Sequence, residues 1–179
     1  MKIIRTILSR PPSRRSLIGL GNFDGVHIGH RTILKKLVDE AAAQQGTALV
    51  MTFHPHPLTV LRPDRPVSLI LSLREKLQRI AAMGVDGIIL QRFELGFASL
   101  TPEEFIQRYL VEAIGVEKVI VGHNVSFGRD RTGNAERLVV LGEQSGFEVE
   151  VVGPVTVGNR AVSSTAVRSL LKAGNMREA

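Results

Sequence analysis

The sequence has 179 residues and a mass of 19.6 kDa, which suits one domain with a small appendage and is too short for two full domains. Cysteine is absent, which excludes disulfide scaffolds, thiol enzymes and proteins with Cys-ligated zinc or iron-sulfur clusters. The formal net charge of +6 and a sequence pI near 10.3 favour anionic partners, among which phosphates, nucleic acids and acidic lipids all qualify.

No stretch of the sequence predicts a membrane span or an export signal. The longest run without a charged residue, from Ala41 to Leu61, contains two Gln, two His, two Pro and a Gly, and is therefore too polar to cross a bilayer. The segment from Met1 to Arg15 is interrupted by Arg5 and Arg10 and has no apolar region long enough for a secretory signal. We expect a cytoplasmic protein without a membrane partner.

In the first part of the chain, short apolar runs alternate with segments of helical periodicity. A strand is predicted over Leu17 to Leu20, followed by a helix from Ile28 to Gln45 with its apolar residues on one stripe. A second strand, from Ala48 to Phe53, ends in the proline-broken sequence at 54–57. This order is strand, turn, helix, strand.

The rest of the chain continues the alternation. Thr101-Pro102-Glu103-Glu104 has a capping residue, a proline in the first turn and an acid at the third helical position, which predicts a helix up to about Ile114. The other predicted elements are a helix over 72–83 stopped by Gly84, strands over 85–90, 116–121 and 147–152, a loop over 122–133 followed by a helix ending at 144, and a last helix over 164–172.

Strands that are apolar on both faces and alternate with helices predict a parallel sheet covered on both sides, so the expected fold is α/β, doubly wound. Ligands of such sheets bind beyond the carboxyl ends of the strands. The unusual segments all follow predicted strands or begin a helix, at 21–30, 54–57, 122–131 and 163–168. We expect them to converge on one cleft.

The first of these segments reads Gly-Asn-Phe-Asp-Gly-Val-His-Ile-Gly-His at 21–30. Residues three apart on a helix lie about 60° apart, so His27 and His30 face one point at the helix start. Unpaired backbone N–H groups and the helix dipole attract anions there, and Gly25 and Gly29 let a ligand approach the main chain.

No carboxylate or cysteine stands beside these histidines at ligand spacing, which favours a phosphate over a transition metal. The alternative is a turn in which one histidine caps the helix and the other lies on the surface. The flanking glycines and the strand-turn-helix context favour the phosphate site.

A second anion site is predicted at Ser163-Ser164-Thr165-Ala166-Val167-Arg168. Ser164 can cap the final helix, and Arg168 falls on the same face and can bind phosphate oxygens with its guanidinium. The alternative is an ordinary cap followed by a solvated arginine. Two such sites in one cleft suit a polyphosphate.

The two remaining segments carry weaker signals. His54 and His56 are spaced by prolines and form either a rigid rim of the cleft or plain loop histidines. The segment 122–131 combines glycines, the Asn124 amide and the Phe127 ring, which suit a planar ligand with hydrogen-bonding edges, or it is a flexible surface loop.

Together these segments resemble the bacterial FAD synthetases, and more specifically the N-terminal FMN adenylyltransferase module of the bifunctional riboflavin kinase/FAD synthetase family. The resemblance rests on the sequence at 21–30, Thr-Phe-His-Pro-His-Pro at 52–57, Phe-Gly at 127–128 and Ser-Ser-Thr-Ala-Val-Arg at 163–168. It implies a Rossmann-like nucleotidyltransferase fold over residues 1–173. Residues 174–179 then resemble the start of a linker to a riboflavin kinase domain that this sequence lacks, so kinase activity is not expected.

The resemblance implies an enzyme that converts ATP and FMN to FAD and pyrophosphate, with Mg²⁺ accompanying ATP. The FMN phosphate attacks the α-phosphorus in line. A phosphate nucleophile is mostly ionised near neutral pH, so no general base or covalent intermediate is required. Catalysis then consists of holding two polyanions in line and stabilising charge at phosphorus.

The resemblance also assigns roles to single residues. The implied catalytic residues are His27, His30 and Arg168. The implied ATP-binding residues are Gly21, Asn22, Phe23, Asp24, Gly29, Ser163, Ser164 and Thr165, of which the last three hold the β- and γ-phosphates with Arg168. The implied FMN-binding residues are Phe53, His54, Pro55, His56, Asn124 and Phe127. No metal ligand is assigned, because phosphates and water can hold Mg²⁺. Val125 and Arg31 differ from the family's frequent Phe and Gln.

Three alternatives stay open. An adenylyltransferase of similar fold would act on pantetheine phosphate or a nicotinate nucleotide, but the sequences at 52–57 and 122–128 argue against it. A nucleotide sensor would keep the anion sites without turnover. A nucleic-acid-binding domain is disfavoured by seven Phe, one Tyr and no Trp, which leave few stacking platforms.

Overall fold

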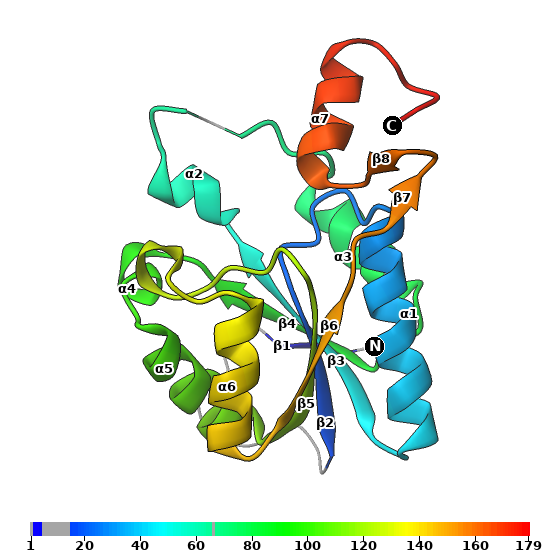
Figure 1. Cartoon of the computed structure of the whole chain (residues 1–179). Coiled ribbons are helices and arrows are strands. Elements are labelled where there is room, and N and C mark those ends of the chain that lie inside the picture. Colours follow the sequence, from blue (N-terminus) through cyan, green and yellow to red (C-terminus); the bar gives the residue numbers. More distant parts are fainter. Residues whose placement is uncertain (1, 5–14, 66) are drawn as a thin grey trace.

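The computed structural model describes residues 2–4, 15–65 and 67–179 (Figure 1). The prediction that residues 1–15 form no signal peptide falls mostly on residues outside these ranges, including Arg5 and Arg10. Within the described ranges, no helix is both long and apolar enough to cross a membrane.

A parallel sheet runs through the centre of the molecule (Figure 1). The described residues contribute six strands to it in the order β1-β4-β3-β2-β5-β6, and every hydrogen-bonded pair is parallel. The strands are β1 (Lys2–Ile4), β2 (Ser16–Leu20), β3 (Thr47–His54), β4 (Gly87–Arg92), β5 (Val116–Gly122) and β6 (Glu148–Val152). Because β2 lies between β3 and β5, the chain reverses its winding direction at β2 and β5, where a ligand is expected to bind.

Helices cover both faces of the sheet (Figure 1). On one face lie α1 (Ile28–Ala43) and α3 (Leu73–Ala81), and on the other lie α5 (Pro102–Phe105), the π-helix η1 (Ile106–Ile114) and α6 (Ala135–Ser145). The shorter elements are α2 (Pro57–Leu61), α4 (Leu95–Ala98), the 3₁₀ turn η2 (Arg129–Arg131), the hairpin β7 (Thr156–Val157) and β8 (Arg160–Ala161), and α7 (Ser164–Lys172).

Neighbouring residues of one strand enter the two cores on opposite faces of the sheet. Leu17 of β2 packs with Leu34 and Leu37 of α1, whereas Ile18 packs with Leu110 of η1 and Leu138 of α6. This alternation follows from the strand period of two. The doubly wound α/β fold predicted from the sequence is confirmed.

The predicted elements are found close to their expected positions, and the differences concern short or edge elements. The capping box between Thr101 and Glu104 is present, but the helix it starts becomes π-helical from Ile106. The edge strand β1, the single-turn helices α2 and α4, and the β7–β8 hairpin were not predicted, because so few residues carry little periodicity.

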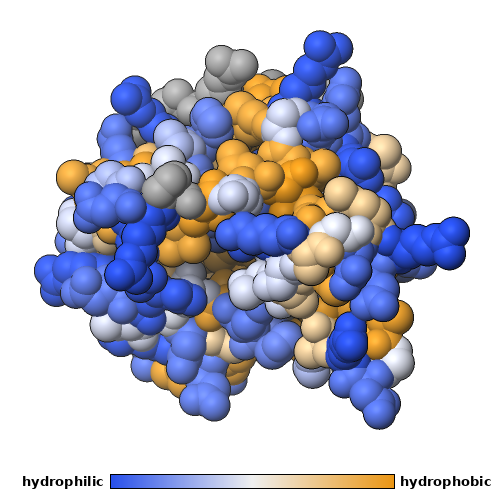
Figure 2. Space-filling model, turned by 90° about the horizontal axis from the view of Figure 1, so that it is seen from above, coloured by the Kyte–Doolittle hydropathy of each residue, from blue (hydrophilic) through white to orange (hydrophobic). Residues whose placement is uncertain are grey.

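The carboxyl ends of the strands face the upper end of the molecule in Figure 1, beside α2, α7 and the start of α1. Figure 2 views this end directly and shows apolar side chains gathered near its middle, surrounded by hydrophilic ones. The segments singled out from the sequence lie at this end, as parallel strands require.

Candidate active site at the carboxyl edge of the sheet

The turn between β2 and α1 is shaped by two buried residues with a left-handed backbone. Phe23 has φ 50° and Val26 has φ 42°, a conformation that is strained for residues with large side chains. The Phe23 ring lies against Gly21, where a Cβ atom would come within 3.2 Å of the ring. The buried ring therefore fixes the turn against the sheet and brings His27 to the N-cap of α1.

His27 and His30 form a stacked pair at the start of α1. Their ring centroids are 3.6 Å apart with 17° between the planes, and the edge of the Phe23 ring lies against His30 at 5.3 Å. The His30 backbone N–H donates to His27 Nδ1 at 3.3 Å. The prediction that both imidazoles meet at one point is confirmed; His27 also caps the helix, and His30 is half-buried rather than on the surface.

Both imidazoles are held in the neutral form. Burial, with repulsion from His27 and Lys76, lowers the pKa of His30 to about 3. Burial also lowers the pKa of His27, although the Asp24 carboxylate opposes the shift. His30 Nδ1 is buried and has no hydrogen-bond partner among the described residues. A neutral imidazole has one donor and one acceptor nitrogen, so the pair offers N–H donors to an anion without carrying charge.

The second predicted anion site lies directly beside this turn. The Ser164 hydroxyl donates to the main-chain oxygen of Asp24 at 2.9 Å, and Arg168 Nη2 lies 2.7 Å from Asp24 Oδ2. The two helix starts therefore meet, as the sequence predicted. The assignment of Ser164 as the cap is wrong by one residue: Ser163 is the N-cap and accepts from the Ala166 N–H at 3.2 Å.

Asp24 connects three parts of the chain. Besides Arg168, its carboxylate accepts from the Ile70 N–H at 3.1 Å and from the Leu71 N–H at 3.5 Å, just before α3. Arg168 Nε also donates to the Ser68 carbonyl at 3.0 Å. The guanidinium that was predicted to bind phosphate is therefore engaged by protein acceptors.

The two glycines of the turn have different roles. Gly25 has φ +87°, and a Cβ atom there would lie 2.9 Å from the Ile70 side chain. Ile70 therefore fills the side of Gly25 where a side chain would lie, and a ligand cannot approach the main chain from that side. At Gly29 a Cβ atom would lie 3.3 Å from the His27 ring, so Gly29 leaves room for the stacked histidines.

Of the other predicted ATP-binding residues, Asn22 and Thr165 are exposed and Gly21 is half-buried.

Sequence reasoning missed Lys76. This residue of α3 is 8% exposed, and its Nζ donates to the carbonyls of Asn22 at 3.2 Å and Phe53 at 3.1 Å. Burial lowers the pKa of Lys76 to about 8, opposed by Asp24. A signal was present, because Lys76 lies on the same helical stripe as Leu73 and Ile80, where an apolar residue is expected.

The turn at 54–57 continues directly from β3. His56 is the N-cap of α2, and its Nδ1 accepts from the Leu58 N–H at 3.2 Å. Burial, together with Arg168 and Lys76, lowers the pKa of His56, and Asp24 opposes the shift. His54 and Pro55 are exposed, and burial with the charge of Lys76 lowers the pKa of His54. This turn therefore borders the Asp24 site.

Phe53 and Phe127, both predicted for a flavin pocket, belong to one cluster of aromatic rings. The distance between ring centroids is 5.8 Å from Phe53 to Phe97, 5.9 Å from Phe97 to Phe105 and 5.7 Å from Phe105 to Phe127. Two further members, Phe93 and Tyr109, complete the cluster. Asn124 is exposed in the loop before Phe127. Sequence reasoning did not find Phe93, Phe97 and Tyr109, because no motif marks them.

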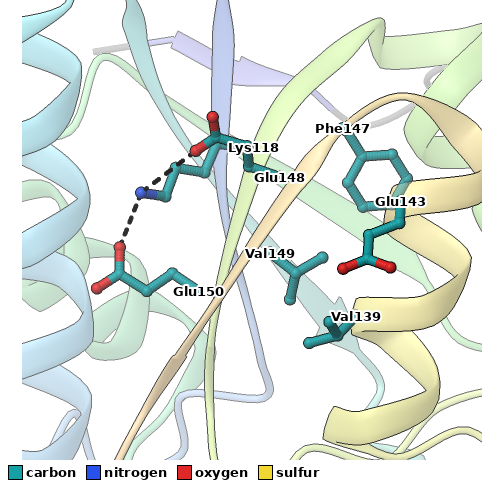
Figure 3. A pocket seen from close by; sticks show the side chains of 7 residues that line it. All are labelled: Lys118, Val139, Glu143, Phe147, Glu148, Val149 and Glu150. Atoms are coloured by element: carbon teal, nitrogen blue, oxygen red, sulfur yellow. Dashed lines mark ion pairs between the residues drawn. The ribbon is translucent and has the colours of Figure 1, made fainter.

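A hollow of about 380 Å³ lies elsewhere, around the amino ends of β5 and β6 (Figure 3). Its lining residues are Lys118, Val139, Glu143, Phe147, Glu148, Val149 and Glu150. It contains none of the residues predicted for chemistry. Among the described residues, no group of three or more His, Cys, Asp or Glu side chains is suited to hold a metal ion.

The family model described as FAD synthetase matches residues 9–166, which is most of the sequence. The chain belongs to the FAD synthetase family. This confirms the family resemblance inferred from the motifs.

Relatives of this FAD synthetase family member are bifunctional. The chain is 38% identical over 178 residues to the bifunctional riboflavin kinase/FMN adenylyltransferase of Escherichia coli K12, which covers 98% of this chain and 57% of the relative. It is 36% identical over 165 residues to the protein of that name from Listeria monocytogenes, covering 91% of this chain and 52% of the relative. The chain thus spans little more than half the length of these relatives.

Among solved structures, the chain is similar to a crystal structure from Streptococcus pneumoniae described as a macrolide-efflux protein. The TM-score is 0.81 at 29% sequence identity, and the match covers 95% of this chain and 56% of the other. The agreement over nearly the whole chain supports the doubly wound fold of this FAD synthetase family member.

Proposed function

We propose that this chain is an FMN adenylyltransferase, which transfers the adenylyl group of MgATP to FMN and releases pyrophosphate. The observation that carries the proposal is the contact between the two helix starts through Asp24, Ser164 and Arg168. Two sets of first-turn N–H groups at one place suit a ligand with several phosphates. The choice of ATP and FMN as substrates follows from the relatives, which are named riboflavin kinase/FMN adenylyltransferase.

In the proposed reaction, an oxygen of the FMN phosphate attacks the α-phosphorus of ATP. The bond from that phosphorus to the oxygen bridging the β-phosphate breaks, and pyrophosphate leaves. His27 and His30 donate N–H groups to the phosphates as charge develops, and the phosphates' negative charge favours protonation of the imidazoles. No protein nucleophile takes part.

Gly21, Asn22, Phe23, Asp24 and Gly29 are proposed to form the ATP side of the site. Ser163, Ser164, Thr165 and Arg168 are proposed to bind the β- and γ-phosphates. For this, Arg168 exchanges or shares its contact with Asp24, because two of its nitrogens are bonded to protein oxygens. Such an exchange couples nucleotide binding to the position of α7.

FMN is proposed to bind between the turn at 54–57 and the loop at 124–127, with Phe53, His54, Pro55, His56, Asn124 and Phe127 in contact. Support comes from the aromatic cluster, which joins Phe53 to Phe127 and offers apolar surface to a flavin ring. Mg²⁺ enters with ATP as part of the substrate and is held mainly by phosphate and water oxygens.

The proposal extends to the role of the chain in the whole protein. Residues 1–173 are proposed to form the adenylyltransferase domain, and residues 174–179 to begin a linker toward a riboflavin kinase domain, an activity that the names of the relatives include. The end of α7 at Lys172 supports this division. A cytoplasmic location, without nucleic acid or membrane partners, is part of the same proposal.

The test is FAD formation from MgATP and FMN, followed by chromatography, with pantetheine phosphate and nicotinate mononucleotide in parallel reactions. We expect FAD from the wild-type protein and a loss of about 10²-fold or more in His30→Ala. Adenylylation of another acceptor would favour a related transferase, and ATP binding without turnover would favour a sensor. Tight, salt-dependent RNA binding without adenylyl transfer would favour a nucleic-acid-binding domain.

A further inference from the structure

Lys76 is a buried ammonium group that the reaction proposed above does not use. Its three N–H donors have three acceptors: the Asn22 carbonyl at 3.2 Å, Thr52 Oγ1 at 3.1 Å and the Phe53 carbonyl at 3.1 Å. Thr52 Oγ1 itself donates to the Asn22 carbonyl at 3.0 Å. The donors are therefore directed at protein oxygens, and Lys76 acts through the groups it holds.

These acceptors belong to two different sides of the site. Asn22 lies in the turn that leads to His27 and His30, while Phe53 immediately precedes the turn at 54–57. Close to the start of the first turn, the main chains of the two segments are also joined where the Gly21 N–H donates to the Met51 carbonyl at 3.1 Å. After Gly21 and Met51, the two segments are joined by the hydrogen bonds of the Thr52 hydroxyl and of Lys76.

Lys76 is held in the fold at a cost. Because the folded-state pKa of about 8 lies below the ordinary value of 10.5, the buried lysine destabilises the folded protein as the pH falls below 10.5, with the full effect below about 8. Replacing such a group by an apolar residue of similar size is often neutral for stability. A purely structural role thus does not account for a lysine at this position.

We propose that Lys76 is a positioning residue for adenylyl transfer: by binding the Asn22 and Phe53 carbonyls, it fixes the nucleotide-binding turn relative to the flavin-binding turn. The inference rests on the proposed function, since it concerns how the two substrates are aligned. In-line attack requires the reacting atoms to be within about 3.5 Å of each other, and a misplacement of about 1 Å can reduce the rate about 10²-fold.

The charge of Lys76 is surrounded by groups from several elements. Asp24 faces it from the β2–α1 turn, His30 from α1, and His54 and His56 from the end of β3. Arg168 of α7 is paired with Asp24. The histidines are neutral above pH 7, so loss of the Lys76 proton is the change expected in this group above about pH 8.

The kinetic test compares Lys76→Met, which removes the donors, with Lys76→Arg, which keeps a cation. Arg74→Met, at an exposed position of the same helix, is the control. We expect kcat to fall about 10²-fold in Lys76→Met with KM for ATP and FMN within about threefold of wild type, and partial recovery in Lys76→Arg. In wild type, kcat/KM falls above about pH 8; in Lys76→Arg this limb moves to higher pH.

A second measurement does not depend on turnover. In hydrogen exchange, peptides covering residues 20–25 and 52–58 of Lys76→Met are expected to exchange at least about tenfold faster than in wild type, while peptides of β5 are unchanged. Circular dichroism and thermal unfolding verify that the variant is folded.

The outcomes separate the two proposals. Unchanged kcat in a folded Lys76→Met, or unchanged exchange in both peptides, overturns the role of Lys76. A fall in thermal stability that accounts for the whole loss of activity overturns it as well. Wild-type protein that forms no FAD overturns the proposed function, and the exchange experiment still decides whether Lys76 joins the two turns.

Discussion

Arg168 Nη2 lies 2.7 Å from Asp24 Oδ2, in a pair whose side chains are 18% and 5% exposed. The contact joins residues 144 positions apart in the sequence and fastens α7 to the β2–α1 turn. Asp24 lies in the turn that leads into α1, and Arg168 lies in the second turn of α7. If the nucleotide binds as proposed, its phosphates compete with Asp24 for the guanidinium of Arg168.

The Asp24–Arg168 pair predicts unequal effects of its two halves on stability. Asp24→Ala leaves Arg168 and the Ile70 N–H without their acceptor, so we expect a loss of about 3 kcal/mol in the free energy of unfolding. Arg168→Met leaves Asp24 bonded to backbone N–H groups and is expected to cost about 2 kcal/mol. Urea unfolding measures both.

The control for this pair is Arg160→Met, which breaks the exposed pair with Glu178, whose side chains are 78% and 58% exposed. Its cost is expected to stay below about 1 kcal/mol. Equal losses in all three variants would show that burial of the Asp24–Arg168 pair has no energetic consequence.

The low pKa of His30 predicts a pH dependence of stability. Between the ordinary value of 6.5 and the folded-state value of about 3, the unfolded chain binds a proton at His30 and the folded protein does not. Stability therefore falls as the pH is lowered through this window, by up to about 1.4 kcal/mol per pH unit. His30→Asn removes this part of the slope in urea unfolding. A slope that is the same in His30→Asn as in wild type would contradict a buried neutral His30.

The ion pairs around Lys118 predict a stability effect far from the site. Lys118 Nζ lies 2.6 Å from Glu40 and 2.8 Å from Glu150 (Figure 3 shows the Glu150 contact). Burial opposes ionisation of Glu150, but its hydrogen bonds with Lys118 and Lys36 outweigh this and lower its pKa to about 2. Lys118→Met removes the less exposed of the two lysines that pair with Glu40 and Glu150 and leaves Lys36 in place, so we expect a loss of about 1 kcal/mol at pH 7.

This loss should shrink as the pH falls from 4.5 toward 2, because Glu150 stabilises the fold only while it is ionised. Lys35→Met, in a pair with side chains 71% and 58% exposed, is the control and should cost less than about 0.5 kcal/mol. FAD formation per folded molecule should be unchanged in both variants. A loss in Lys118→Met that is independent of pH would rule out the ion-pair explanation.

Two glycine substitutions separate helix stability from the geometry of the site. In Gly29→Ala, the new Cβ atom would lie 3.3 Å from the His27 ring and displace it from His30, so FAD formation is expected to fall about tenfold. Alanine favours the helix by up to about 1 kcal/mol, so the melting temperature should not fall. In Gly96→Ala, nothing lies within 4 Å of the new atom, and only the helix gain is expected. Equal activities would show that the histidine stack does not matter for turnover.

The sequence determined the elements of the fold, because their signals are local. Apolar runs such as Leu17 to Leu20 and the helical stripe of 28–45 are sufficient to identify a buried strand and the helix that covers it. Alternation of such elements leaves few topologies, and the parallel sheet follows from them. The capping box at Thr101 is likewise encoded in a few consecutive residues.

The motifs lie together at the predicted edge of the sheet, because all carboxyl ends of parallel strands meet there. The residues that contact these motifs could not be predicted from the sequence. Ser163 rather than Ser164 caps α7, and Ile70 fills the space beside Gly25, since both outcomes depend on how distant segments pack. The rings of Phe93 and Phe97 join Phe53 for the same reason.

Only the tertiary structure decided what the charged groups of the site do. Lys76 stands out in the sequence as a lysine on an apolar stripe, but its acceptors come from residues 22, 52 and 53, which the pairing of β2 with β3 brings beneath α3. In the sequence, Asp24 and Arg168 belong to two separate motifs. They form a pair only because α7 packs beside the turn between β2 and α1. Local periodicity specifies which residues are buried, whereas the partner of a buried charge is specified only by contacts between segments far apart in the chain.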